Sequence, residues 1–183
     1  METITLITGA PGTGKTTVSR ALADRSARGA HIPSDIFYTF PAHPVRPHLA
    51  AADAQNQAVI AAAFQAAAAF ARRGYEVYLD GIFGPWFVPF IAGELAPAVP
   101  SFHYVILRAP LETALARIRK RSGHPEDEVV RQMHAEFEQH AGTYERNIVE
   151  TDTLTLDETA AEILRRRERG DFLMELENRK SDA

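Results

Sequence analysis

Residues 9–16 have the sequence GAPGTGKT, and no other segment limits the possible folds of this chain as strongly. Glycine and proline are so frequent here that the segment is a poor candidate for either helix or strand. It follows the β-branched run TITLIT at 3–8, which predicts a strand, and it precedes a run from Lys15 with apolar residues at helical spacing. The pattern G-x-x-x-x-G-K-T between a strand and a helix is that of a P-loop.

A P-loop binds phosphate mainly through its backbone. Its glycines let successive N–H groups point into one concavity, and the N-terminus of the following helix adds positive partial charge. Lys15 is then expected to contact the β- and γ-phosphates of a nucleotide, and the Thr16 hydroxyl to ligate Mg²⁺. The predicted nucleotide-binding residues are Gly9, Ala10, Pro11, Gly12, Thr13, Gly14, Lys15, Thr16 and Thr17.

The rest of the chain alternates between strand and helix patterns. Further strands are predicted at 30–35, 75–80, 102–109 and, weakly, 147–151, and helices at 51–73, 84–95 (interrupted by Pro89), 110–121, 126–141 and after a capping box at 155–158. Such alternation indicates an α/β protein, with a parallel sheet covered by helices on both faces. We expect a single domain over 1–170, followed by a charged, frayed tail at 171–183.

Two aspartates follow predicted strands. Asp80 ends the strand at 75–80 and Asp35 ends the strand at 30–35, so both are expected at the ligand-binding edge of a parallel sheet. Asp80 is the candidate for a second Mg²⁺-binding residue, with a turn-capping role before Gly81 as the alternative. Asp35 is the candidate general base that takes a proton from an incoming hydroxyl, with an N-cap for a short helix at Ile36 as the alternative.

Two arginines, Arg117 and Arg121, lie four residues apart on one predicted helix, just before the loop SGHPED at 122–127. A lid over 117–130 could place Arg117 on the nucleotide and Arg121 on the transferring phosphoryl group, as a catalytic residue. The alternative is an ordinary solvated helix face, because arginine is very common throughout this chain.

Composition excludes several other classes of protein. The formal net charge of −4 and the pI of about 6.0 argue against nucleic acid as a main partner. The chain has no cysteine, so it has neither a disulfide framework nor a thiolate metal site. No apolar run is long enough for a membrane span, and the N-terminus lacks the basic region of a signal peptide. We therefore expect a cytoplasmic protein with no membrane partner, either a monomer or a homodimer.

Taken in order, these motifs resemble the small P-loop kinases, and most closely the AAA_33-type, chloramphenicol-phosphotransferase-like group. The segment YLDGIFGP resembles the DGFPR segment of adenylate kinases, except that Trp86 follows the proline, and RIRKRSGHP resembles the lid of gluconate kinases; shikimate kinases are also related. The resemblance spans about residues 3–165. It implies a five-stranded parallel sheet in the order 2-3-1-4-5, an acceptor-binding segment at about 36–73, ATP and Mg as cofactors, and Asp35 as the base.

Three functions remain open from the sequence. The first is a small-molecule kinase that transfers the γ-phosphoryl group of ATP to a hydroxyl of an antibiotic-, nucleoside- or sugar-like acceptor. The second is a nucleoside monophosphate kinase of the cytidylate type, whose acceptor phosphate calls for arginines that the Phe-, Tyr- and Pro-rich acceptor segment largely lacks. The third is a nucleotide-binding regulator without an acceptor. The N-K-x-D signature of GTPases is absent, which favours ATP.

Overall fold

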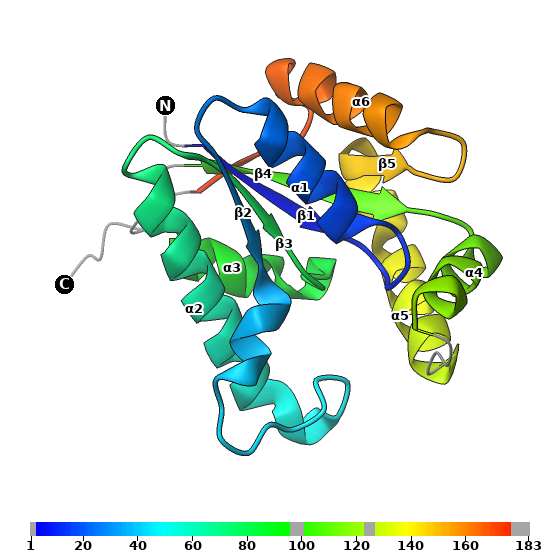
Figure 1. The fold of residues 1–183 in the computed structure, drawn as a ribbon. Coiled ribbons are helices and arrows are strands. Elements are labelled where there is room, and N and C mark those ends of the chain that lie inside the picture. Colours follow the sequence, from blue (N-terminus) through cyan, green and yellow to red (C-terminus); the bar gives the residue numbers. More distant parts are fainter. Residues whose placement is uncertain (1–2, 96–100, 123–126, 177–183) are drawn as a thin grey trace.

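The computed structural model describes residues 3–95, 101–122 and 127–176, and all structural statements below concern these ranges. Its centre is one twisted sheet, with β1 (Thr3–Thr8) in the middle (Figure 1). The strand order is β2-β3-β1-β4-β5, all parallel, which confirms the predicted order. The remaining parallel strands are β2 (Gly29–Pro33), β3 (Glu76–Asp80), β4 (Ser101–Arg108) and β5 (Ile148–Glu150).

Helices cover both faces of this sheet (Figure 1). On one face lie α1 (Lys15–Arg25) and α6 (Leu156–Glu168), and the opposite face carries α2 (Asp53–Ala71) and α3 (Val88–Leu95). The two remaining helices, α4 (Leu111–Ser122) and α5 (Asp127–His140), pack against each other around a small apolar cluster of their own. Short 3₁₀ turns complete the chain: η1 (Ser34–Thr39), η2 (Ala50–Ala52), η3 (Pro85–Phe87) and η4 (Ala141–Asn147).

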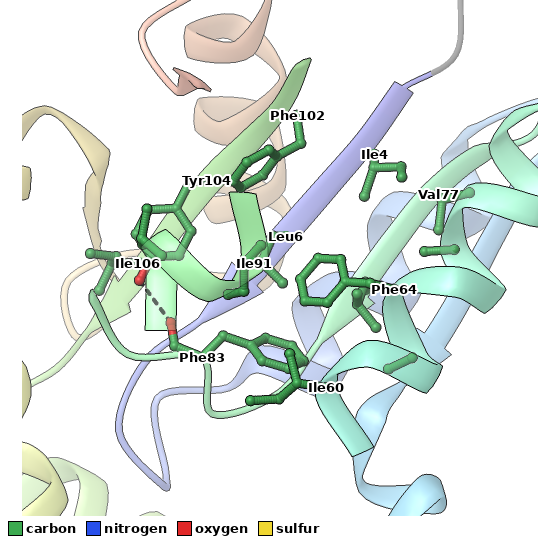
Figure 2. Packing of buried hydrophobic residues seen from close by; sticks show 14 of the residues in the cluster. Ile4, Leu6, Ile60, Phe64, Val77, Phe83, Ile91, Phe102, Tyr104 and Ile106 are labelled. Carbon is green, nitrogen blue, oxygen red and sulfur yellow. Dashed lines mark hydrogen bonds between the residues drawn. The ribbon is translucent and has the colours of Figure 1, made fainter. Parts of the chain in front are cut away.

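The alternation of side chains along the strands divides the core into two layers. In β1, Leu6 points toward the α2 face and Ile7 toward the α1 face, and both are fully buried. Figure 2 shows the larger layer, where Phe64 of α2 meets Phe83 with ring centroids 5.4 Å apart. The hydroxyl of buried Tyr104 donates a 2.7 Å hydrogen bond to the Phe83 carbonyl. This bond ties β4 to the loop after β3, which forms part of the site described below.

The predicted helix interruption at Pro89 is wrong. Pro89 lies in the first turn of α3, where a backbone N–H would have no partner within the helix. Proline is tolerated at such a position, so the helix runs on to Leu95. The capping box is confirmed, since Thr155 caps α6 and Glu158 bonds back to the Thr155 N–H.

The chain after Gly170 also departs from the expected frayed tail. Phe172 is fully buried against the α1 face, and β6 (Leu173–Glu175) pairs antiparallel with Ser101–His103 of β4. The reason is that the short β5 pairs only with residues 106–108, which leaves the first part of β4 as an open edge. An unpaired edge is unfavourable, and β6 covers it. The sheet therefore has six strands, one more than expected.

Candidate active site

The P-loop follows β1 and ends at the first turn of α1, as predicted. Gly12 and Gly14 have positive φ angles of 86° and 97°, a backbone conformation that residues other than glycine rarely adopt. A Cβ atom on Gly12 would also lie 2.5 Å from the Ala114 carbonyl oxygen, so the close approach of α4 excludes any larger residue there. These glycines shape a backbone cradle at a helix N-terminus, an arrangement suited to phosphate oxygens.

Lys15 curls back over this cradle. Its ammonium group donates hydrogen bonds to the carbonyls of Gly9 and Ala10, at 3.0 and 3.1 Å. Removal from water lowers the pKa of Lys15 to about 8, against the opposing influence of the negative charges of Asp35 and Asp80. A phosphate group in the cradle would give this cation a stronger partner than two backbone carbonyls.

Thr16 and Asp80 meet where the P-loop faces the end of β3. The Thr16 hydroxyl donates a 2.9 Å hydrogen bond to one oxygen of Asp80, whose side chain is buried, and His31 of β2 contacts the other oxygen at 2.5 Å. A hydroxyl and a carboxylate are oxygen ligands suited to Mg²⁺, which takes one or two protein ligands beside waters and nucleotide phosphates. The pair therefore fits the predicted metal role. In the described ranges there is no cluster of three or more acidic or histidine side chains that could bind a metal without such help.

A cleft of about 430 Å³ lies over the P-loop. Its lining includes the backbone and side chains from Pro11 to Thr17, together with Asp35, Arg117, Arg121 and apolar side chains such as Ile82 and Leu156. Gly9 and Ala10 lie behind this lining and bind Lys15. The cleft has the size of a small-ligand site, and the helix dipole and three cations favour an anionic ligand.

The two arginines of α4 are held differently. The Arg117 guanidinium donates to the hydroxyl and the carbonyl of Thr151, at 3.2 and 2.7 Å, and the Thr151 hydroxyl in turn donates to the P-loop carbonyl of Thr13. Arg117 is thus fixed beside the P-loop. Arg121 is exposed and near enough to Lys15 to lower its pKa. The middle of the predicted lid loop, at 123–126, lies outside the described residues.

Asp35 is not the last residue of its strand, contrary to the prediction. β2 ends at Pro33, and Asp35 lies in the first turn of η1, which begins at Ser34; the alternative N-cap for a helix at Ile36 is therefore also wrong. Because Pro33 pairs with Asp80 in the sheet register, the chain still leaves β2 at the edge where β3 ends. Asp35 consequently lies at the same edge of the sheet as Asp80, but two residues beyond the end of its strand and not at the end itself.

A second cleft, of about 540 Å³, adjoins the first and shares Pro11, Asp35 and Ile82 with it. Its walls come from η1, from the loop before η2, from α2, from the loop and turn after β3, and from α5. The remaining lining residues are Ser34, Tyr38, Pro47, His48, Asn56, Val59, Phe83, Trp86, Phe87, Val129, Gln132, Met133 and Glu136. Tyr38 donates a hydrogen bond to Asn56 at 3.1 Å, and burial, with the charge of Asp35, raises its pKa to about 12. Tyr38 therefore stays protonated at neutral pH.

A match to a known family model shows to which protein family this chain belongs. A model of the AAA_18 family, an AAA domain, matches residues 5–140, which is most of the protein. The chain belongs to this family. No curated protein sequence matches it.

Several solved structures share the fold of this AAA_18 chain at 14–20% sequence identity. The tunicamycin resistance protein of Deinococcus radiodurans aligns with a TM-score of 0.71 at 20% identity, over 90% of this chain and 95% of the other. A gluconokinase from Sinorhizobium meliloti 1021 gives 0.67 at 18% identity, over 92% and 93%. Shikimate kinase from Acinetobacter baumannii, in complex with shikimate, gives 0.64 at 18% identity, over 92% and 94%. The predicted resemblance to the small P-loop kinases is confirmed.

Sequence reasoning missed several residues of the AAA_18 site. His31, which holds Asp80, looks like any polar residue in a short strand. Thr151, which links Arg117 to the P-loop, lies directly after β5, and a polar residue at that strand end could have been flagged as Asp80 was. Gln132 and Glu136 face the second cleft from α5, and their i, i+4 spacing was the only signal available. Two aromatic residues of the predicted acceptor segment are placed differently: Tyr38 lines the second cleft, whereas Phe40 is 69% exposed.

Proposed function

We propose that the protein is an ATP- and Mg²⁺-dependent kinase that phosphorylates a hydroxyl of a small molecule. The observation that carries this proposal is the pair of adjoining clefts with Asp35 in the lining of both. The cleft over the P-loop suits a nucleoside triphosphate, and the second cleft suits the acceptor. Because Asp35 lines both clefts, it would lie close to both reacting groups. The family match and the fold support the class of reaction.

The chemistry follows from the positions of these groups. The P-loop N–H groups and Lys15 would bind and neutralise the β- and γ-phosphates, while Thr16 and Asp80 would hold the magnesium ion. Magnesium supplies further neutralisation of charge on the phosphates. Asp35 would orient the acceptor hydroxyl and accept its proton as the new oxygen–phosphorus bond forms. The bond between the γ-phosphorus and the bridging oxygen breaks, and ADP leaves with that oxygen. Arg121 would stabilise charge on the transferring group.

The acceptor cleft argues against a nucleoside monophosphate as acceptor. Such a substrate carries a phosphate dianion, and proteins commonly bind this group with arginine. Among the described residues that line the acceptor cleft there is neither lysine nor arginine, whereas Asp35 and Glu136 are both present. A regulator without an acceptor would need no cleft of this size beside the P-loop. The hydroxyl kinase is therefore the better supported function.

An acceptor screen tests the proposal. Purified protein, ATP and Mg²⁺ are incubated with panels of antibiotics, nucleosides, sugars and nucleoside monophosphates, and ADP release is measured. We expect release that depends on a hydroxyl-bearing compound and is lost in Lys15→Ala. Turnover confined to nucleoside monophosphates would contradict the proposal and support the second alternative. ADP release that no acceptor stimulates would support the third.

A further inference from the structure

The acceptor cleft has an unbalanced set of charges. Its described lining contains two carboxylates, Asp35 and Glu136, and no lysine or arginine. Asp35 also lines the nucleotide cleft, where Lys15 partly offsets its charge. Glu136, in contrast, lines the acceptor cleft but not the nucleotide cleft. It accepts a 3.0 Å hydrogen bond from Gln132 one helical turn away, and within the described ranges it forms no ion pair. A cation in the cleft would supply the missing partner.

Much of the rest of the cleft is apolar or aromatic, beside a few polar side chains that include Ser34, His48 and Asn56. Phe83, Trp86 and Phe87 come from the loop and turn after β3, and Val129 and Met133 line the cleft beside Glu136 on α5. An open groove of about 430 Å³ extends outward from the same Trp86 and Phe87 and adds a further carboxylate, Asp53. Aromatic faces attract cations as well as apolar groups. The lining thus repels an anionic acceptor and suits one that combines an apolar body with a positive charge.

We propose that the acceptor is an amine-bearing alcohol with an apolar or aromatic body, whose ammonium group binds Glu136 and whose hydroxyl meets Asp35. This inference rests on the proposed function only for the fate of the hydroxyl, because the binding preference follows from the cleft alone. The same two carboxylates disfavour alcohols that carry a carboxylate or a phosphate group.

The chain contains a single tryptophan, and it is Trp86 in the wall of this cleft. Intrinsic tryptophan fluorescence therefore reports binding in the acceptor cleft or in the groove that adjoins it, without ATP and without turnover. Three probes with the same phenylpropyl skeleton separate charge from shape: phenylalaninol is cationic, N-acetylphenylalaninol is neutral, and 3-phenyllactate is anionic. All three carry a hydroxyl.

We expect phenylalaninol to bind about fivefold more tightly than N-acetylphenylalaninol, the upper end for a partly exposed ion pair. 3-Phenyllactate should bind most weakly, and added salt should reduce the difference between the probes. Equal affinities for the three probes, tightest binding of 3-phenyllactate, or no saturable fluorescence change with phenylalaninol would each overturn the inference.

A matched pair of variants assigns the preference to Glu136. Glu136→Gln keeps the size and the hydrogen bond from Gln132, and it should reduce the preference for phenylalaninol over its acetylated form to about one. Glu128→Gln alters an exposed glutamate on the same helix, outside the acceptor cleft, and should leave the preference unchanged. An unchanged preference in Glu136→Gln would contradict the proposed ion pair. Because these measurements contain no ATP, a failed acceptor screen and a failed charge preference are distinguishable.

Discussion

The two clefts are neighbours of similar size, but they differ in which parts of the chain form them. The phosphate-binding part of the nucleotide cleft is one contiguous segment, Pro11 to Thr17, whose backbone N–H groups face the ligand. The acceptor cleft is made from side chains of η1, α2, α5 and the chain after β3, which are far apart in the sequence. The first can bind the group common to all nucleotides, whereas the second can change its specificity by single substitutions. A phosphate-binding cleft built on the backbone and a cleft built from side chains thus adjoin each other, and Asp35 lines both.

The largest expected effect is on the nucleotide side. Lys15→Ala should lower turnover by about 10³- to 10⁵-fold, the range for an arginine that stabilises a transferring phosphoryl group. The fold should persist, because the ammonium group binds only two P-loop carbonyls. Thermal unfolding with and without Mg·ATP is the second measurement, since bound ligand raises the stability of the wild type by mass action. Lys120→Ala, on the exposed face of α4, is the control. Full turnover in Lys15→Ala would remove this lysine from phosphate binding.

Asp35→Asn tests the residue that the two clefts share. It should lower kcat by about 10²- to 10⁴-fold while ATP affinity changes little, because the amide keeps the shape of the carboxylate but accepts no proton. Asp24→Asn, exposed on α1, is the matched control. An unchanged kcat with a raised KM for the acceptor would instead assign Asp35 to acceptor binding, as expected if the attacking group were already ionised.

His31→Ala should separate the support of the metal site from the chemistry. Without His31, one oxygen of Asp80 loses its 2.5 Å contact, so the carboxylate is less well oriented toward Mg²⁺. The Mg²⁺ concentration for half-maximal activity should rise about tenfold, the low end for a residue that orients a metal ligand. Activity at saturating Mg²⁺ should largely recover. His43→Ala, at an exposed loop position, should behave like the wild type, and a similar shift in both variants would argue against this role.

The smallest effect is a dependence on pH. The pKa of Lys15 is lowered to about 8, so Lys15 loses its positive charge above this pH, whereas in the unfolded chain it stays protonated to about 10.5. The affinity for ATP should fall about fivefold between pH 8 and 9, as the protonated fraction of Lys15 decreases. Over the same window the unfolded chain binds more protons at this residue, so its contribution to folding stability rises with pH.

Lys15→Arg provides the control for this titration. Arginine stays charged throughout the range, so the variant should bind ATP with little dependence on pH between 8 and 9. Calorimetric titrations at several pH values measure both affinities. An equal decrease in the wild type and in Lys15→Arg would assign the pH dependence to another group.

Local sequence patterns were enough to predict much of the fold and some of the residues of the candidate site. The P-loop, the capping box at Thr155 and the alternation of strands and helices depend on neighbouring residues, so they could be predicted from the sequence. Asp35 and Asp80 were placed at the correct edge of the sheet because parallel strands end on the same side. The residue-level error at Asp35 arose because nothing in the segment HIPSD marks where pairing with β3 stops.

The sequence by itself therefore determined a phosphate-binding loop, its lysine and the parallel sheet that presents them, because each depends on backbone geometry encoded within a few residues. Only the tertiary structure decided that His31 holds Asp80, that Thr151 links Arg117 to the P-loop, and that β6 closes the open edge of β4. It also placed Glu136 of α5 in the same cleft as the aromatic residues that follow β3. Such contacts join segments separated by tens of residues, and only the packing of helices against the sheet brings them together.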